Sequence, residues 1–111
     1  MSLPVIRSPE SLGDLAGQIE WYHGKGGRPL ARRFIDTVNE TVRLLATHPL
    51  LGKAREFRHP KLQKMRFYVV ARPFNRHLIF YRVRPDALDL FRVMHGMRDL
   101  PRRLLQPPGA D

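Results

Sequence analysis

Apolar residues recur at helical spacing from the ninth residue onward. One face of the segment carries Leu12, Leu15, Ala16, Ile19 and Tyr22, which fall three or four positions apart. Ser8 followed by Pro9 is a typical helix start, because serine caps the first turn and proline suits the first helical position. The pattern therefore predicts a helix over residues 9–23. The glycine-rich segment 23–27 is expected to end it.

A second amphipathic pattern begins at Pro29 and ends before His48-Pro49. Its apolar stripe consists of Ala31, Phe34, Val38, Thr41 and Leu45, with charged residues on the opposite side. This predicts a second helix over residues 29–47. Because the linker between the two helices is short, we expect an antiparallel helical hairpin.

The pattern in the second half changes to short runs rich in aromatic and β-branched residues. These runs predict strands over residues 65–71, 77–83 and 87–95, separated by turns at 72–76 and 84–86. Such tight connections imply an antiparallel meander, to which the short apolar segment 3–7 is expected to add a strand. Residues 49–64 are interpreted as a basic loop.

The predicted fold class is therefore α+β, with the order β-α-α-β-β-β and an antiparallel sheet carrying the helical hairpin on one face. A chain of 111 residues fits one domain, which we place at 1–105, followed by a flexible tail at 106–111. No cysteine, membrane span or signal-peptide pattern occurs in the sequence. These features are consistent with a cytoplasmic protein.

Charge is distributed unevenly along the chain. Residues 1–51 carry six basic and five acidic side chains, whereas residues 52–111 carry fourteen and five, so the halves sum to +1 and +9. A basic second half favours a polyanionic or acidic partner. The alternative is an arginine-rich proteome, since arginine outnumbers lysine sixteen to four.

Two histidines are the strongest candidates for chemistry. His77 and His95 lie at the two outer ends of a predicted hairpin, so antiparallel pairing brings them together, and Arg98 could join them. Two imidazoles and a guanidinium suffice for metal-free RNA cleavage, as base, acid and phosphate-stabilising cation. The alternative, which is the commoner role of such histidines, is that they only fill strand ends. Metal-ligand spacing and a phosphate-binding glycine loop are absent from the sequence, so neither a metal nor a cofactor is expected.

Two motifs give the chain a family resemblance. The run HLIFYRV, followed by D-x-L-x-L-x-R-V-x-H-G-x-R-D-L-P, closely resembles the C-terminal half of ParE-type toxins of the RelE/ParE superfamily. In the first half, Ser8-Pro9 before Asp14-Leu15, Pro29-x-Ala31-x-x-Phe34, and Leu45-x-x-x-Pro49-x-x-Gly52 agree with it. The resemblance extends over about residues 5–105 of the sequence.

The resemblance implies a toxin of a type II toxin–antitoxin module, with plasmid stabilisation as a cellular role and a ParD-like antitoxin as partner. ParE-type members are associated with inhibition of DNA gyrase, whereas RelE-type members cleave mRNA in the ribosome. The ribonuclease branch carries arginine where His77 stands, arginine where Arg98 stands, and tyrosine or histidine near Leu104. Two of these three positions depart from that pattern, so a gyrase inhibitor is favoured over an enzyme. A ribosome-dependent mRNA endonuclease using His77, His95 and Arg98 is the alternative.

The antitoxin's C-terminal segment is expected to wrap the toxin, along the helical hairpin or at a free sheet edge. Opposite charges would speed this association. The candidate contacts with the antitoxin or the target are Trp21, Tyr22, Arg32, Arg33, Arg43 and Arg98. Ordinary core or solvated positions are the alternative for these side chains. No membrane partner is expected.

Overall fold

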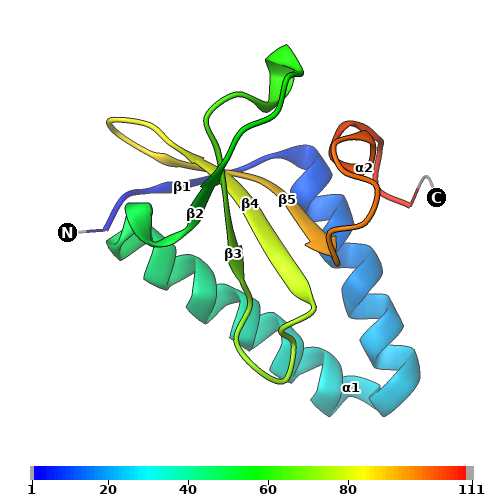
Figure 1. The fold of residues 1–111 in the computed structure, drawn as a ribbon. Helices are drawn as coiled ribbons and strands as arrows, with labels where there is room; N and C mark the ends of the chain where they lie inside the picture. The colour runs from blue at the N-terminus through cyan, green and yellow to red at the C-terminus, as the bar shows by residue number, and fades with distance from the viewer. Residues whose placement is uncertain (1, 110–111) are drawn as a thin grey trace.

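The computed structural model describes residues 2–109, which form a five-stranded sheet packed against one long bent helix (Figure 1). The elements in chain order are β1 Val5–Arg7, α1 Pro9–Thr47, η1 Pro49–Leu51, β2 Lys53–Arg55, η2 Pro60–Leu62, β3 Met65–Val69, β4 His77–Val83, β5 Leu88–His95 and α2 Arg102–Leu105, where η marks a 3₁₀ turn. The predicted α+β class is confirmed. Within residues 2–109, no helix combines the length and the apolar character needed to cross a membrane.

Helix α1 consists of two arms that meet at a glycine kink. Ser8 caps the first arm, since its Oγ accepts a hydrogen bond from Ser11 N at 2.9 Å. The backbone stays helical past the predicted end at residue 23 and leaves helical geometry at Gly26 and Gly27. Gly27 has φ +71°, a conformation that favours glycine. The first arm, 9–25, and the second arm, 28–47, form the V visible in Figure 1.

The sheet has the strand order β1-β5-β4-β3-β2. The predicted meander of β3, β4 and β5 is confirmed as two antiparallel pairs. The prediction of an all-antiparallel sheet was wrong in one pair, because β1 runs parallel to β5. The direction of a three-residue edge strand is set by the path of the following helix, and its own apolar pattern carries no such information.

Strand β2 was also missed, because it lies in the segment interpreted as a basic loop. Lys53–Arg55 pairs with Met65–Phe67 of β3 in antiparallel register. With a basic residue at each end, this strand lacks the apolar alternation by which a half-buried strand is recognised. Three strand boundaries differ from the prediction by one or two residues: β1 begins at Val5, β3 ends at Val69 and β5 begins at Leu88.

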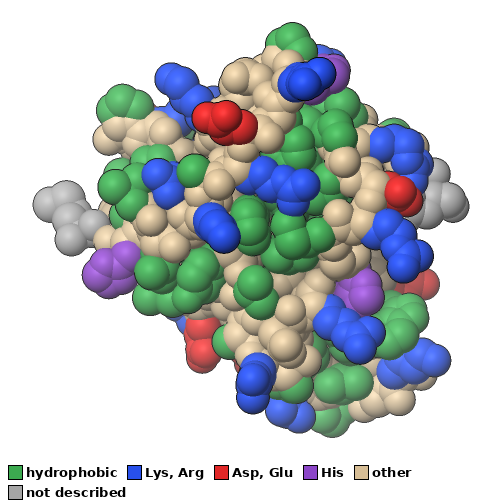
Figure 2. Space-filling view, viewed as in Figure 1, with side chains coloured by type: hydrophobic (Ala, Val, Ile, Leu, Met, Phe, Trp, Pro, Cys, Tyr) green, Lys and Arg blue, Asp and Glu red, His purple; other side chains and the backbone are tan. Residues whose placement is uncertain are grey.

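Both faces of the sheet are covered. The main core lies between the second arm and the sheet and includes Phe34, Val38, Val42, Leu45, Ile79, Tyr81, Leu88, Leu90 and Val93. On the opposite face, η2 and α2 contribute Leu62 and Leu104 to a smaller cluster with Leu78 and Phe80. Consecutive β4 residues thus point into opposite cores, which explains why this strand is apolar throughout. In the view of Figure 2, hydrophobic side chains lie near the middle of the face, with Lys and Arg side chains around them.

Candidate functional site

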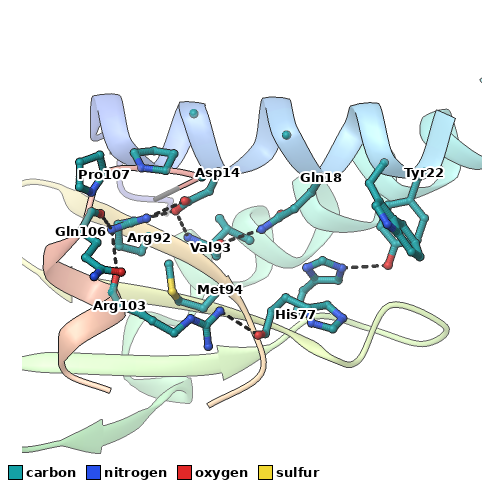
Figure 3. Close-up of a pocket in the computed structure, with 16 residues that line it drawn as sticks. Asp14, Gln18, Tyr22, His77, Arg92, Val93, Met94, Arg103, Gln106 and Pro107 are labelled. Carbon is teal, nitrogen blue, oxygen red and sulfur yellow. Dashed lines mark hydrogen bonds and ion pairs between the residues drawn. The ribbon is translucent and has the colours of Figure 1, made fainter. Parts of the chain in front are cut away.

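Strand β5 is bordered by two different elements along its outer edge. Strand β1 pairs only with Leu88–Leu90, and the first arm of α1 borders the remainder. There, Asp14 Oδ2 accepts a hydrogen bond from Val93 N at 3.0 Å, and Gln18 Nε2 donates to Val93 O at 2.8 Å (Figure 3). Two helix side chains therefore satisfy the edge groups of Val93 that a further strand would otherwise bind.

A buried ion pair holds the first arm to this half of the strand. Arg92 donates from Nε and Nη2 to the two carboxylate oxygens of Asp14, each at 2.7 Å. The two side chains are only 3% and 5% exposed. Arg92 Nη1 also donates to the carbonyls of Arg103, Leu104 and Gln106, at the end of α2. One guanidinium thus joins α1, β5 and the C-terminal segment.

A β-bulge in β5 precedes this arginine. Phe80 is opposite Arg92 and Tyr81 is opposite Leu90, so Phe91 is the extra residue. Sequence reasoning missed the role of Arg92, although a signal was present. A cation within the apolar run Leu90–Met94 must either reach solvent or find a partner, because burying an unpaired charge is costly. The identity of that partner required the fold.

The two candidate histidines are brought together, as the hairpin predicts. His77 and His95 are paired across β4 and β5, with ring centroids 5.0 Å apart in an edge-to-face arrangement. His77 is 2% exposed, and its Nε2 lies 2.8 Å from the hydroxyl of Tyr22. Burial, and secondarily the nearby His95, lower the pKa of His77 to about 4. His77 is therefore neutral at neutral pH, and one of its two ring nitrogens is hydrogen-bonded to the Tyr22 hydroxyl.

Arg98 does not complete this group. Its side chain is exposed in the turn after β5, outside the set of residues that lines the neighbouring cavity. Arg103 lies there instead, with Nη2 donating to His95 O at 3.0 Å and Nη1 donating to Arg98 O at 2.9 Å. The expected trio of two imidazoles and Arg98 is thus reduced to a histidine pair.

A cavity of about 430 Å³ lies between the first arm of α1, the ends of β4 and β5, and the C-terminal segment. Its wall includes Gly17, Gln18, Trp21, His77, Met94 and Gln106. Within residues 2–109, three buried side-chain polar atoms have no hydrogen-bond partner, namely Gln18 Oε1, His77 Nδ1 and Gln106 Oε1. All three residues line this cavity. The three atoms themselves have almost no accessible surface, and leaving a buried polar group unpaired costs about 1–3 kcal/mol.

The C-terminal segment that closes one side of the cavity belongs to the predicted tail, 106–111. Gln106–Gly109 line the cavity, and Pro108 packs against the first arm at Gly13. A Cβ added at Gly13 would lie 2.7 Å from Pro108 Cγ, so this close approach requires glycine. Residues 110 and 111 lie outside the described part of the chain.

The predicted antitoxin and target contacts fall into two groups. Trp21 and Tyr22 line the cavity; Trp21 is 58% exposed, and Lys25 Nζ lies 5.3 Å from its ring centroid. Arg32, Arg33 and Arg43 are exposed on the second arm, beyond the kink. Among residues 2–109 no cluster of three or more His, Asp or Glu side chains suited to a metal ion occurs.

Comparisons with known proteins identify the fold and the family. A family model described as the ParE toxin of type II toxin–antitoxin system, parDE, matches residues 5–100. Among solved structures, a chain described as the chromosomal ParDE TA system from P. aeruginosa is similar, with a TM-score of 0.69 and 17% sequence identity. The match covers 86% of this chain and 98% of that chain. No curated protein gives a significant match. At this identity the structural likeness concerns the fold alone, whereas the family model spans most of the sequence.

Proposed function

This chain belongs to the family of ParE toxins of type II toxin–antitoxin systems, and on this basis we propose that it inhibits DNA gyrase and is neutralised by a ParD-like antitoxin. The observation that carries the proposal is the family match over residues 5–100. Plasmid stabilisation would be the cellular role. Because gyrase acts on DNA inside the bacterial cell, the toxin would work in the cytoplasm.

The charge of the molecule supports an acidic partner. The formal net charge is +10, and the exposed arginines of the second arm, Arg32, Arg33 and Arg43, present part of it on one helix. A positive surface accelerates the encounter with an acidic antitoxin and strengthens its dependence on ionic strength. Trp21, the exposed aromatic residue of the first arm, would provide an apolar anchor for a partner segment.

The histidine pair favours inhibition over RNA cleavage. A general base in metal-free RNA cleavage must reach the 2′-hydroxyl group, within hydrogen-bonding distance. His77 is 2% exposed, and its Nε2 is hydrogen-bonded to the Tyr22 hydroxyl. Arg98, the expected phosphate contact, lies outside the cavity wall that holds both imidazoles. We therefore rank a ribosome-dependent mRNA endonuclease second.

A gyrase supercoiling assay with the purified chain tests the proposal. We expect inhibition that increases with toxin concentration and disappears when the cognate antitoxin is added. The variant His95→Ala should inhibit as the wild type does, since the exposed imidazole has no catalytic task in this account. Unimpaired supercoiling, together with ribosome-dependent mRNA cleavage that His95→Ala abolishes, would replace the proposal with the endonuclease alternative.

Charge reversal on the second arm tests the antitoxin contact. The double variant Arg32→Glu/Arg43→Glu should slow association with the antitoxin by about tenfold at low salt, and less at high salt. Arg72→Glu/Arg76→Glu is the matched control, because both arginines are exposed but lie in the turn between β3 and β4. Stopped-flow or surface-based kinetics measure the rates. Equal slowing by the control would mean that the net charge, and not the second arm, guides the antitoxin.

A further inference from the structure

The segment that leads from β2 through η2 into β3 carries half of the net charge of the molecule. We define the basic hairpin as residues 53–66, which contain six basic side chains and a single acidic one and so sum to +5, against +10 for the chain. Its cations are Lys53, Arg55, Arg58, Lys61, Lys64 and Arg66. Figure 1 shows this connection, in green, projecting beyond the sheet. We propose that the basic hairpin binds the phosphate backbone of duplex DNA without reading its sequence.

The cations of the basic hairpin are not neutralised by the protein itself. The ion pairs present within residues 2–109 involve none of them, and most of the six side chains are exposed. The second arm of α1 differs, because residues 28–47 sum to only +2 and Arg32 pairs there with Asp36. We therefore expect the positive potential to be strongest at the basic hairpin, where a polyanion gains most.

Hydrogen bonds hold the basic hairpin in one shape. Gln63 Nε2 donates to Phe57 O at 2.7 Å and to His59 O at 3.0 Å. Arg82 of β4 donates from Nε to Gln63 O at 2.8 Å and from Nη2 to Lys61 O. A loop that is fixed in this way loses less conformational entropy on binding than a flexible basic tail does.

The surface of the basic hairpin is polar, which favours nucleic acid over a protein partner. Among residues 2–109, none of the large hydrophobic side chains that are exposed lies within residues 53–66. Protein–protein interfaces rely on apolar or aromatic anchors at their centre, whereas protein–DNA interfaces are more polar and much more positively charged. An acidic protein segment would find charge here but no anchor.

The aromatic rings beside the cations favour a duplex over a single strand. Phe57 is half-buried, and Arg55 Cζ lies 5.1 Å from its ring centroid. Phe67, also half-buried, packs on Phe80 with ring centroids 5.8 Å apart. Proteins bind single strands by stacking bases on exposed aromatic rings, and these two rings are partly covered. A duplex offers more charge instead, with one negative charge per about 1.7 Å of its axis.

Fluorescence anisotropy with the full chain tests the proposal in the absence of gyrase, so its outcome is separate from that of the inhibition assay. The probes are two duplexes of unrelated sequence, about 20 base pairs long, one of their single strands, and polyglutamate. We expect both duplexes to bind with affinities equal within about threefold, and the single strand and polyglutamate to bind more weakly. Binding should weaken steeply as salt is added, because each phosphate contact releases counterions.

A matched pair of triple variants locates the contact. Both remove three positive charges from exposed positions, the first in the basic hairpin and the second in the second arm of α1. The variants are Arg58→Ala/Lys61→Ala/Lys64→Ala and Arg32→Ala/Arg33→Ala/Arg43→Ala. The first should weaken duplex binding more than tenfold at about 50 mM salt and reduce the slope of log K against log salt by about 2–3, since each contact contributes about 0.9. The second should change the slope by less than about 0.5, with circular dichroism confirming that both fold.

Lys64 allows binding to be separated from stability. Its φ is +60°, a left-handed conformation that glycine adopts more readily than lysine. Lys64→Gly should therefore keep the melting temperature of the wild type or raise it, and still reduce the salt slope by about 1. Undetectable duplex binding at about 50 mM salt, tighter binding of the single strand or of polyglutamate than of the duplex, or equal weakening by the two triple variants would each overturn the proposal.

Discussion

The two halves of β5 show two ways of closing a sheet edge. Along Leu88–Leu90 the main chain of β1 pairs with the strand, and Leu88 N donates to Pro4 O at 2.9 Å. Around Val93 the side chains of Asp14 and Gln18 take the place of a strand. Adjacent strands lie about 4.8 Å apart, whereas an α-helix with its side chains is about 10–12 Å across, so its axis lies farther from the strand. Closure by a helix therefore leaves room beside the strand, and the cavity occupies it.

The largest expected effect comes from removing the carboxylate of Asp14, which borders the second half of β5. Asp14→Ala leaves the buried guanidinium of Arg92 unpaired, so the free energy of unfolding should fall by about 3–5 kcal/mol. Urea unfolding followed by circular dichroism measures it. Asp36→Ala is the matched control, because Asp36 pairs with Arg32 at side-chain exposures of 57% and 75% and should cost under about 0.5 kcal/mol. If Asp14→Ala lowers the free energy of unfolding by less than about 1 kcal/mol, the ion pair does not hold the first arm of α1 against β5.

A pH-dependent effect of intermediate size is expected from His77, which lies in the cavity wall. The pKa of His77 is about 4 in the folded protein, against an ordinary value of 6.5. Well above pH 6.5, this residue is neutral in both the folded and the unfolded state. As the pH falls towards 4, the unfolded chain takes up a proton that the folded protein refuses, so stability decreases. The loss from this group should reach about 2 kcal/mol near pH 5 and about 3 kcal/mol near pH 4.

Comparison with a non-titrating variant isolates this contribution. His77→Gln should unfold with a flatter pH dependence between about pH 7 and 5, although it is less stable at neutral pH because it loses the Tyr22 contact. His48→Gln, at an exposed position, should keep the slope of the wild type. Parallel slopes for all three proteins would show that His77 is not held neutral by the fold.

A smaller effect is expected from the second side chain that closes the edge. Gln18→Leu removes the hydrogen bond to Val93 O and also the unpaired Oε1, so the net loss should be about 1 kcal/mol. Glu20→Leu, at an exposed position of the same arm, should change stability by less than about 0.5 kcal/mol. Equal stability of Gln18→Leu and the wild type would indicate that water satisfies Val93 O equally well.

The sequence predicted the elements that follow a hydrophobic period. The two helical arms, the meander of β3, β4 and β5, and the pairing of His77 with His95 all follow from apolar spacing and tight turns. Strand β2 and the parallel direction of β1 do not, because three-residue edge strands carry too few positions to show a period. The resemblance pointed to the family that the comparison with known proteins supports.

The cavity could not be predicted from the sequence, for a different reason. It depends on Asp14, Gln18 and Arg92, which are polar residues within apolar patterns, and on contacts across 78 and 75 positions of the chain. A pattern can show that such a residue is out of place, but only the fold identifies its partner. Arg98 illustrates the converse, since its proximity to His95 in sequence suggested a contact, yet its side chain is turned to solvent.

Amide hydrogen exchange at Val93 tests most directly whether helix side chains replace a strand along β5. In the wild type, the Val93 amide should exchange as slowly as the Leu88 amide, within about tenfold, because a buried carboxylate holds it as firmly as the Pro4 carbonyl holds Leu88. In Asp14→Asn, exchange at Val93 should accelerate while Leu88 is unchanged. Rapid exchange at Val93 in the wild type, with Leu88 protected, would contradict the account.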